Sequence, residues 1–387
     1  MSYDQDLSFV YFGPTKVIFG NGSSTSEVES EMRALGCSRA VVVTDHGIIA
    51  AGLLDKITRA LGEKCVGVFS DVPQDTGVDV VDSGAAFARE KRADSIISLG
   101  GGSVIDTAKC ICILLTEGGS LADFEGIQLL SRLQTPHIAI PTTAGTGSEV
   151  TWAAVVFDKS KGQKILIVES FNAPRVAILD PLLTAKLPPL LTASTGMDAF
   201  CHAVEAISSL QREPVADALA LHAIRLLDKY LPLCVTGGDL NARGQVQLAA
   251  TMAGWAFGNA MVGLVHAMAH SIGAVAHVPH GVANGILLPY CMEYNLPDAQ
   301  DCYAEIAMAM GLYEKGLSIQ ESAESAVHAV FEFTKKIGHP QKLSAVGVTE
   351  EHIGKAAELS MADGSIVNNV RFITGSGEVL GIYKKAF

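Results

Sequence analysis

The sequence predicts an N-terminal α/β unit built on a parallel sheet, followed by an all-helical unit. In the first half of the chain, short apolar runs alternate with stretches of helical periodicity, which is typical of a parallel sheet covered on both faces. After the Asp180-Pro181 pair, no convincing strand pattern remains and long helical patterns follow. Prolines 181, 188 and 189 interrupt regular structure there. We therefore expect two domains, residues 1–183 and 184–387.

Five apolar runs are expected to form the strands of the sheet, because each is nearly free of polar side chains, as a strand buried on both sides should be. They are residues 40–44, 65–69, 95–99, 137–140 and 176–179. Helical patterns lie between the strands at residues 48–61 and 78–91. In the second half, helices are expected over residues 194–210, 215–231, 244–258, 261–275 and 301–310.

The composition excludes several classes of protein. The 387 residues include 28 Lys and Arg against 41 Asp and Glu, a net charge of −13, and 49% are hydrophobic while only 18% are charged. This balance excludes intrinsic disorder. It also argues against nucleic acid and anionic membrane surfaces as partners, because both require a basic surplus.

The charged residues are unevenly distributed, and none occurs between Gly244 and Met292. Glycines and four histidines interrupt this stretch, so we interpret it as buried helices around a polar site and not as a membrane segment. The eight cysteines are scattered, without a C-x-x-C pair, and are expected to be reduced thiols. The N-terminus is acidic and lacks the apolar region of a signal peptide, so we expect a cytoplasmic protein.

A glycine-rich loop follows the expected strand at residues 95–99. It reads Gly-Gly-Gly-Ser from Gly100 to Ser103 and opens a helical pattern. Consecutive glycines let the backbone approach a ligand closely, and the N-terminus of the following helix favours a diphosphate. The loop matches neither the G-x-G-x-x-G nor the Walker pattern, so a purely structural turn stays open as an alternative.

A second loop strengthens the hypothesis of a phosphate site. Residues 141–149 follow the next strand and contain four hydroxyl side chains and two glycines. Ligands of open α/β sheets lie beyond the carboxyl ends of the strands, so the two loops indicate one long phosphate-bearing ligand in a Rossmann-like, dinucleotide-binding domain. Asp45 also ends a strand. Its carboxylate either binds a ribose diol, which would favour NAD over NADP, or caps the helix that follows.

Histidines and one aspartate in the helical half suggest a metal site. Asp198 and His202 are four residues apart, as are His266 and His270, so each pair shares one helix face. His280 lies between Pro279 and Gly281, which predicts a turn. Burying imidazoles in a segment without charges is costly unless something satisfies them, and iron(II) or zinc suits these ligands.

A dinucleotide loop combined with a metal site indicates an oxidoreductase. A Lewis-acid metal lowers the pKa of an alcohol, whose hydride then passes to a nicotinamide. A metal-dependent hydrolase is the alternative from another class, but it would not need the two loops or Asp45. A cofactor-binding protein without turnover is a third possibility, and the intact ligand set argues against it.

Five segments of the sequence resemble motifs of a known protein family. Residues 100–109 resemble its G-G-G-S-x-x-D-x-A-K motif, residues 141–151 its P-T-T-A-G-T-G-S-E-V-T motif, and residues 196–205 its G-M-D-A-x-x-H-A-x-E motif. Residues 263–270 and 279–281 are similar to its G-L-x-H-x-x-A-H and P-H-G segments. The chain thereby resembles the iron-containing, or group III, alcohol dehydrogenases over essentially its whole length.

The resemblance implies roles for particular residues. The metal ligands would be Asp198, His202, His266 and His280, with iron(II) bound and zinc as the alternative. His270 would not be a ligand but would lie near the nicotinamide and the substrate and relay a proton, and no role transfers to His277. The cofactor site for NAD would consist of Asp45, Gly101, Gly102, Ser103, Asp106, Thr142, Thr143, Thr146, Thr151, Lys164 and Leu183.

The resemblance leaves the substrate and the assembly open. The family implies a homodimer or larger homo-oligomer acting on a primary or secondary alcohol, and a zinc-dependent polyol or hydroxy-acid dehydrogenase of the same fold is the alternative. Two segments depart from the family pattern. Gln74-Asp75-Thr76 replaces an N-P-T segment near the adenine site, and Asn369-Val370-Arg371 replaces an N-P-R segment.

Overall fold

The structure is a computed structural model that describes residues 6–74, 76–158, 163–312 and 314–387, so Asp75 of the departing segment lies outside the described residues. The chain divides into two compact units. One is the α/β unit, Gly13–Lys186, and the other is the helical unit, Leu187–Phe387, which also includes the segment ending at Phe12.

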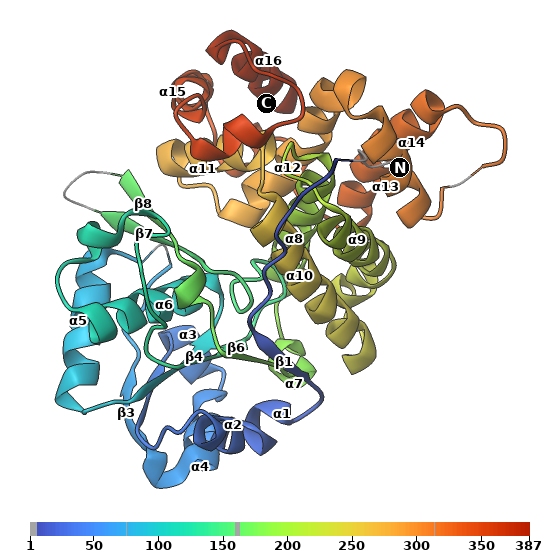
Figure 1. Ribbon diagram of the computed structural model, residues 1–387. Helices are drawn as coiled ribbons and strands as arrows, with labels where there is room; N and C mark the ends of the chain where they lie inside the picture. The colour runs from blue at the N-terminus through green and yellow to red at the C-terminus, as the bar shows by residue number, and fades with distance from the viewer. Residues whose placement is uncertain (1–5, 75, 159–162, 313) are drawn as a thin grey trace. The chain divides into compact units, whose positions relative to one another are not determined.

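The α/β unit contains a six-stranded sheet in which all strands run parallel, in the order β1-β9-β6-β4-β2-β3 (Figure 1). Its strands are β1 Lys16–Phe19, β2 Ala40–Val43, β3 Cys65–Phe69, β4 Ser95–Gly100, β6 His137–Pro141 and β9 Val176–Leu179. All five expected strands are present. The sequence did not predict β1, because this short strand lies at the edge of the sheet and its residues are partly exposed.

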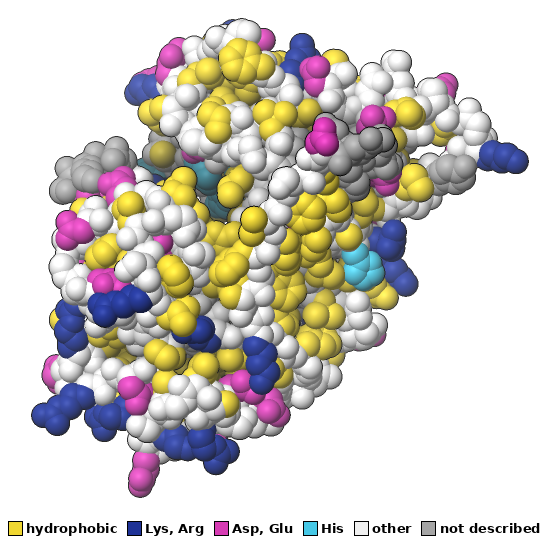
Figure 2. Space-filling view, in the orientation of Figure 1, with side chains coloured by type: hydrophobic (Ala, Val, Ile, Leu, Met, Phe, Trp, Pro, Cys, Tyr) yellow, Lys and Arg dark blue, Asp and Glu magenta, His cyan; other side chains and the backbone are white. Residues whose placement is uncertain are grey.

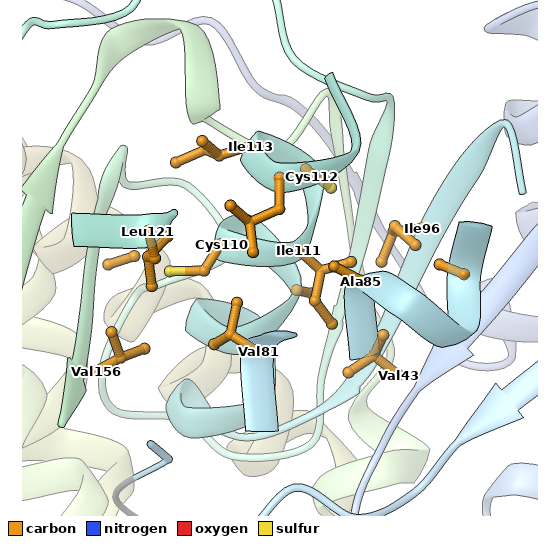
Figure 3. Packing of buried hydrophobic residues seen from close by; sticks show 14 of the residues in the cluster. Val43, Val81, Ala85, Ile96, Cys110, Ile111, Cys112, Ile113, Leu121 and Val156 are labelled. Carbon is orange, nitrogen blue, oxygen red and sulfur yellow. The ribbon is translucent and has the colours of Figure 1, made fainter. Parts of the chain in front are cut away.

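Alternating side chains of the strands pack against helices on both faces of the sheet. Val41, Val43 and Ile96 belong to a core cluster with α5 and α6, whereas Val42 and Ile97 belong to a second cluster with α2 and α4. Figure 3 shows the first cluster, with labelled residues of α6 packed against residues of the strands. The helices of the unit are α1 Ser23–Ser26, α2 Val28–Ala34, α3 His46–Ala50, α4 Leu54–Leu61, α5 Val78–Glu90, α6 Gly102–Glu117 and α7 Pro181–Thr184.

Two expectations for this unit need correction. The helix predicted over residues 48–61 is wrong, because Gly52 has φ +69 and separates α3 from α4. The unit also contains a second sheet in the order β5-β8-β7, formed by β5 Gly126–Ile127, β7 Ala153–Asp158 and β8 Gln163–Val168. Buried and half-buried residues alternate along β7, although its first five residues form a continuous apolar run that was not predicted to be a strand.

The regular structure in the described part of the helical unit consists of helices, as expected. They are α8 Pro189–Ser208, α9 Pro214–Val235, α10 Leu240–Ala260, α11 Leu264–Ala276, α12 His280–Asn295, α13 Gln300–Ala309, α14 Ile319–Lys336, α15 Glu350–Ser360 and α16 Ser376–Ala386. The turn predicted at His280 is wrong, because His280 is the first residue of α12 and Pro279 is its N-cap. Proline favours helix starts because its φ is already helical.

In the described residues, no single helix is both long and apolar enough to cross a membrane. Helices α10 and α11, whose one charged residue is Arg243, are long and apolar enough only as a pair, which is bent by 103° at its break. Figure 2 shows hydrophobic side chains over α9 and α10 on the face in view. On the same face of the α/β unit, basic side chains alternate with acidic ones and form no single basic patch.

Candidate functional site

Helices α8 and α11 bring three of the predicted ligands together. Asp198 and His202 lie one turn apart on α8, and both are buried. His266 is the third residue of α11 and is also buried. One potential ligand atom from each of these three residues lies within 4.8 Å of the others, which is the spacing of groups that bind one cation.

The fourth predicted ligand, His280, joins this cluster from the first turn of α12. Its Nε2 atom lies 3.4 Å from Oδ1 of Asp198, and its ring centroid lies 5.3 Å from that of His266. The ring of His202 stacks on that of His266 at 4.6 Å and on Phe257 at 4.0 Å. The structure therefore brings all four residues to one place in the helical unit. We call Asp198, His202, His266 and His280 the four-residue cluster.

Glu205 orients one imidazole of this cluster. Its buried carboxylate accepts a hydrogen bond of 2.6 Å from the backbone N–H of Val265 and lies 2.5 Å from Nδ1 of His266. A carboxylate at this distance holds the proton on Nδ1, so the lone pair of His266 is on Nε2 and faces the cluster. Burial raises the pKa of Glu205 to about 7, although the backbone N–H groups that it contacts oppose this shift.

Burial also sets the charge of the cluster. Desolvation holds the pKa values of His266 and His280 well below the usual range for imidazole, so both rings are neutral at pH 7 and able to bind a cation. Burial raises the pKa of Asp198 as well, but the facing histidines and Asn284 together keep this pKa below its ordinary value. The cluster thus combines the neutral imidazoles of His266 and His280 with the carboxylate of Asp198.

This donor set fits a divalent cation. Three imidazoles and one carboxylate are ligands that iron(II) and zinc both accept. Asn284 supports the same interpretation, because its Nδ2 atom contacts three cluster residues while its buried Oδ1 atom has no hydrogen-bond partner in the described chain. Lone pairs gathered at one buried point are costly unless a positive group faces them.

His270 lies beside the cluster. Its ring stacks on that of His280 at 5.1 Å with an angle of 13°, and its Nδ1 atom lies 2.9 Å from Oδ2 of Asp363. The side chain of His270 is 32% exposed, and that of His280 beside it is 36% exposed, so these two rings are accessible whereas Asp198 and His266 are buried. His277 is exposed and ends α11 in the left-handed conformation, which assigns it a role as a helix C-cap.

The two glycine-containing loops of the α/β unit lie against each other, because β4 and β6 are neighbours in the sheet. The N–H of Thr142 donates to the carbonyl of Gly100 over 3.0 Å. A Cβ atom on Gly102 would lie 2.7 Å from Cγ2 of Thr146, and one on Gly101 would lie 3.4 Å from Thr143. The close approach of the loops therefore requires glycine at position 102, whereas a Cβ atom at position 101 would be in ordinary contact. Gly101 is the N-cap of α6, and Ser103 lies in the first turn of that helix.

Asp45 lies at the same edge of the sheet, after β2, which pairs with β4. Its Oδ1 atom accepts a hydrogen bond of 2.9 Å from the N–H of Ile48, so the helix-capping alternative is what the structure shows for this oxygen. A ribose contact would have to use the other carboxylate oxygen. Carboxyl ends of adjacent parallel strands are where dinucleotides bind in folds of this class.

The buried side chain of Lys109 on α6 holds the second loop against the helix that follows the first loop. The ammonium of Lys109 donates to Ser148 Oγ over 2.8 Å, Thr151 Oγ1 over 3.2 Å and the carbonyl of Ala153 over 2.8 Å. The carboxylate of Asp106 accepts from Ser148 Oγ over 2.5 Å and from a backbone N–H over 3.1 Å. Asp106 and Thr151 are thus engaged within the protein, as parts of the network that holds the loops in place.

The remaining predicted cofactor residues differ in their surroundings. Leu183 is buried in the apolar cluster that includes α4, whereas Lys164 on β8 is exposed. Thr142 is buried next to the glycine loop, and Thr143 and Thr146 are half-buried. The loop residues and Asp45 gather at one edge of the sheet.

Sequence reasoning missed four residues that contact these sites: Glu205, Asn284, Asp363 and Lys109. Glu205 gave a usable signal, since Asp198, His202 and Glu205 share one face of α8. Asn284 lies four residues after His280, a spacing that has meaning only once α12 is known to begin at His280.

Comparison with known proteins identifies the family of the chain. Residues 14–181 match the family model described as iron-containing alcohol dehydrogenase, and residues 192–387 match the C-terminal model of the Fe-containing alcohol dehydrogenase family. The chain is 40% identical to a 1,3-propanediol dehydrogenase of Citrobacter freundii over 98% of this chain and 99% of the relative. It is 35% identical to an NAD-dependent methanol dehydrogenase of Bacillus methanolicus over 94% and 96% of the two chains.

A solved structure shares the whole fold. The crystal structure of a 1,3-propanediol oxidoreductase superimposes with a TM-score of 0.95 and 39% identity, covering 98% of this chain and 100% of the other.

Proposed function

Because the chain belongs to the iron-containing alcohol dehydrogenase family, we propose that its four-residue cluster binds the catalytic iron(II) of an NAD-dependent alcohol dehydrogenase. Enzymes of this family oxidise an alcohol to an aldehyde or ketone and reduce NAD⁺ to NADH, with release of a proton. The observation that carries the assignment of the site is the convergence of three imidazoles and one carboxylate, all from the helical unit.

Bound there, the cation supplies Lewis acidity, which lowers the pKa of the alcohol and polarises the carbonyl of the product. The protein contributes the orientation of the ligands. Glu205 fixes the tautomer of His266, and burial keeps His266 and His280 neutral. Asp198, His202 and His266 are buried, which limits the access of water to their side of the cluster and helps to protect a hydride from side reactions.

His270 is the proposed catalytic residue. Its contact with Asp363 uses Nδ1, so Nε2 is the ring atom that remains to exchange a proton with the alcohol. Its partial exposure gives that proton a route to solvent. We assign it no role as a ligand.

The two loops and Asp45 are proposed to bind NAD. The free N–H groups at the start of α6 suit the diphosphate, and Gly101 and Gly102 allow a close approach. The half-buried carboxylate of Asp45 would repel the 2′-phosphate of NADP, so NAD is preferred. A hydrolase has no use for these loops, and the comparisons do not favour one.

The substrate we propose to test first is a short primary alcohol or diol, because the similar proteins are a 1,3-propanediol and a methanol dehydrogenase. Chelator-treated protein would be reloaded without oxygen with iron(II) or zinc and mixed with NAD or NADP and a panel of alcohols. We expect the absorbance at 340 nm to rise with iron(II) and NAD. Full activity of the chelator-treated protein, without added metal, would contradict the proposal.

We also propose that the enzyme works in the cytoplasm as a homodimer or larger homo-oligomer. All eight cysteines are free thiols, which suits a reducing compartment. The exposed apolar side chains of Leu7, Phe9 and Val10 support self-association. Light scattering after size-exclusion chromatography measures the mass, and a monomer of 40.6 kDa would contradict the assembly.

A further inference from the structure

The side chain of Asn284 is directed into the four-residue cluster. It is fully buried on α12, one turn after His280. Its Nδ2 atom lies 2.8 Å from Oδ1 of Asp198, 3.2 Å from Nε2 of His266 and 3.1 Å from Nε2 of His280. A single amide nitrogen thus faces three of the atoms that are proposed to hold the cation.

The donors and acceptors of the Asn284 amide do not match the groups that surround it. An amide nitrogen carries two hydrogens, but three lone-pair atoms face it, and His266 has its own proton on Nδ1 beside Glu205. The Oδ1 atom of Asn284 is buried and has no hydrogen-bond partner in the described residues. An orphaned buried acceptor of this kind is costly and requires an explanation.

A second asparagine on the same helix shows what a satisfied buried amide looks like. Asn295 is buried at the end of α12 and exchanges two hydrogen bonds of 2.8 Å with Asn369, so both its amide atoms are paired. Asn284 is therefore not an ordinary buried amide of this helix. Its oxygen has no partner in the described residues, and its nitrogen faces three atoms of the four-residue cluster.

We propose that Asn284 is a further residue of the metal centre and that its amide turns over when the cation binds, so that Oδ1 faces the cation. This inference rests on the proposed metal site. A cation takes up the lone pairs of Asp198, His266 and His280, which removes the acceptors of Nδ2 and sets the positive N–H groups against a positive ion. Turning the amide exchanges two groups of nearly equal size and places a carbonyl oxygen, which is a suitable metal ligand, in the same position.

The experiment uses the full chain, freed of metal and titrated with cobalt(II) chloride. Its readouts are the cobalt dissociation constant, the visible absorption bands of bound cobalt(II) and the Tm of the metal-free protein. Asn284→Leu keeps the branched shape without polar atoms, and Asn284→Asp keeps an oxygen without N–H groups. Asn295→Leu is the matched control on the same helix.

We expect Asn284→Leu to weaken cobalt binding by about 10- to 100-fold, the usual effect of losing a group next to a metal, and to shift the visible bands. The metal-free Tm of this variant should stay near that of the unaltered chain, because an unpaired amide oxygen is removed with the donor. Asn284→Asp should bind cobalt at least as tightly as the unaltered chain. Asn295→Leu should lower the Tm and leave the cobalt affinity and bands unchanged.

Two results would overturn the inference. One is a cobalt affinity and spectrum of Asn284→Leu equal to those of the unaltered chain. The other is an Asn284→Asp variant that binds cobalt as weakly as Asn284→Leu, since the nitrogen and not the oxygen would then matter. Failure of the unaltered chain to bind cobalt at all is a different outcome, because it would reject the metal site itself and the inference with it.

Discussion

The carboxylate of Glu205 on α8 lies 2.5 Å from Nδ1 of His266 on α11. Helices α8 and α11 both supply proposed metal ligands, and this contact joins the two helices next to those ligands. The same carboxylate accepts the N–H of Val265, which fixes the first turn of α11. A buried carboxylate in this position orients the imidazole and increases its basicity toward a metal.

Replacing Glu205 by Gln should therefore weaken metal binding without unfolding the helical unit. Gln keeps the size and an acceptor oxygen, but it loses the charge that polarises His266. We expect the affinity for iron(II) or cobalt(II) to fall about 10- to 100-fold. Metal content after equilibrium dialysis measures the change.

The matched control is Glu213→Gln, because Glu213 is also a buried glutamate of the helical unit but caps α9. This variant should lose some stability and keep its metal affinity. Equal metal content in the two variants would show that Glu205 does not act on the site.

Gly102→Ala should weaken NAD binding by forcing the two loops of the α/β unit apart. The new Cβ atom would lie 2.7 Å from Cγ2 of Thr146, and overpacking of this kind costs about 1–3 kcal/mol. We expect the dissociation constant of NADH, measured by its fluorescence, to rise by roughly tenfold or more. Adding Thr146→Ser removes the opposing methyl group and should restore part of the affinity.

Gly377→Ala is the control for this prediction, because Gly377 also lies in the first turn of a helix but has open space around it. It should leave NADH binding unchanged. Undiminished NADH binding by Gly102→Ala would contradict the close contact of the loops as a requirement for the cofactor.

The sequence was sufficient to predict the parts of the fold in which burial alone determines the residue pattern. The strand at residues 95–99 is buried throughout because α5 and α6 cover one of its faces and α2 and α4 the other, and three of its five residues are accordingly apolar. The strands β7 and β8 were not predicted although each contains an apolar run, because neither belongs to the regular alternation of strand and helix from which the parallel sheet was inferred. The four-residue cluster could be proposed because two of its members share one turn of α8 and a third lies on another helix.

The error at His280 shows where sequence reasoning is insufficient. A proline and a glycine on either side of a residue usually mark a turn. Here Gly281 lies inside α12, and a Cβ atom on it would clash with the carbonyl oxygen of Ser194 on α8. The glycine serves close helix packing, which is a tertiary property that one sequence does not reveal. Without α12, the relation between His280 and Asn284 was also hidden, and Asp363 lies too far along the chain from His270 for any local pattern.

Lys109→Met should destabilise the α/β unit strongly. The buried ammonium donates to Ser148, Thr151 and Ala153, and Asp106 lies 3.6 Å away. Removing the cation leaves these acceptors unpaired and a carboxylate without its counter-charge, which costs about 3–5 kcal/mol for a buried pair. Urea unfolding measures the loss. Lys335→Met removes an exposed lysine paired with Glu332 and should cost less than about 1 kcal/mol. Similar losses in the two variants would contradict the role of Lys109.

His137 should make the α/β unit less stable as the pH falls. It is buried in β6, with Nε2 2.7 Å from Ser98 Oγ, and its Nδ1 atom has no hydrogen-bond partner among the described residues. Burial first, and then the charge of Lys109, lower its pKa to about 3 from an ordinary value of 6.5. Above pH 6.5 the ring is neutral in both the folded and the unfolded chain, so its contribution to stability is complete there.

Between pH 6.5 and 3 the unfolded chain binds a proton that the folded chain does not, so the free energy of unfolding falls as the pH falls. The loss from His137 is about 1.4 kcal/mol per pH unit. His137→Gln removes the titrating ring and should be less stable at pH 7.5 by a fixed amount, with a shallower decline toward pH 4.5. Urea unfolding of both proteins at several pH values measures the two slopes. Parallel slopes would show that His137 gains its proton in the folded chain as readily as in the unfolded one, and burial would then not be what keeps this ring neutral.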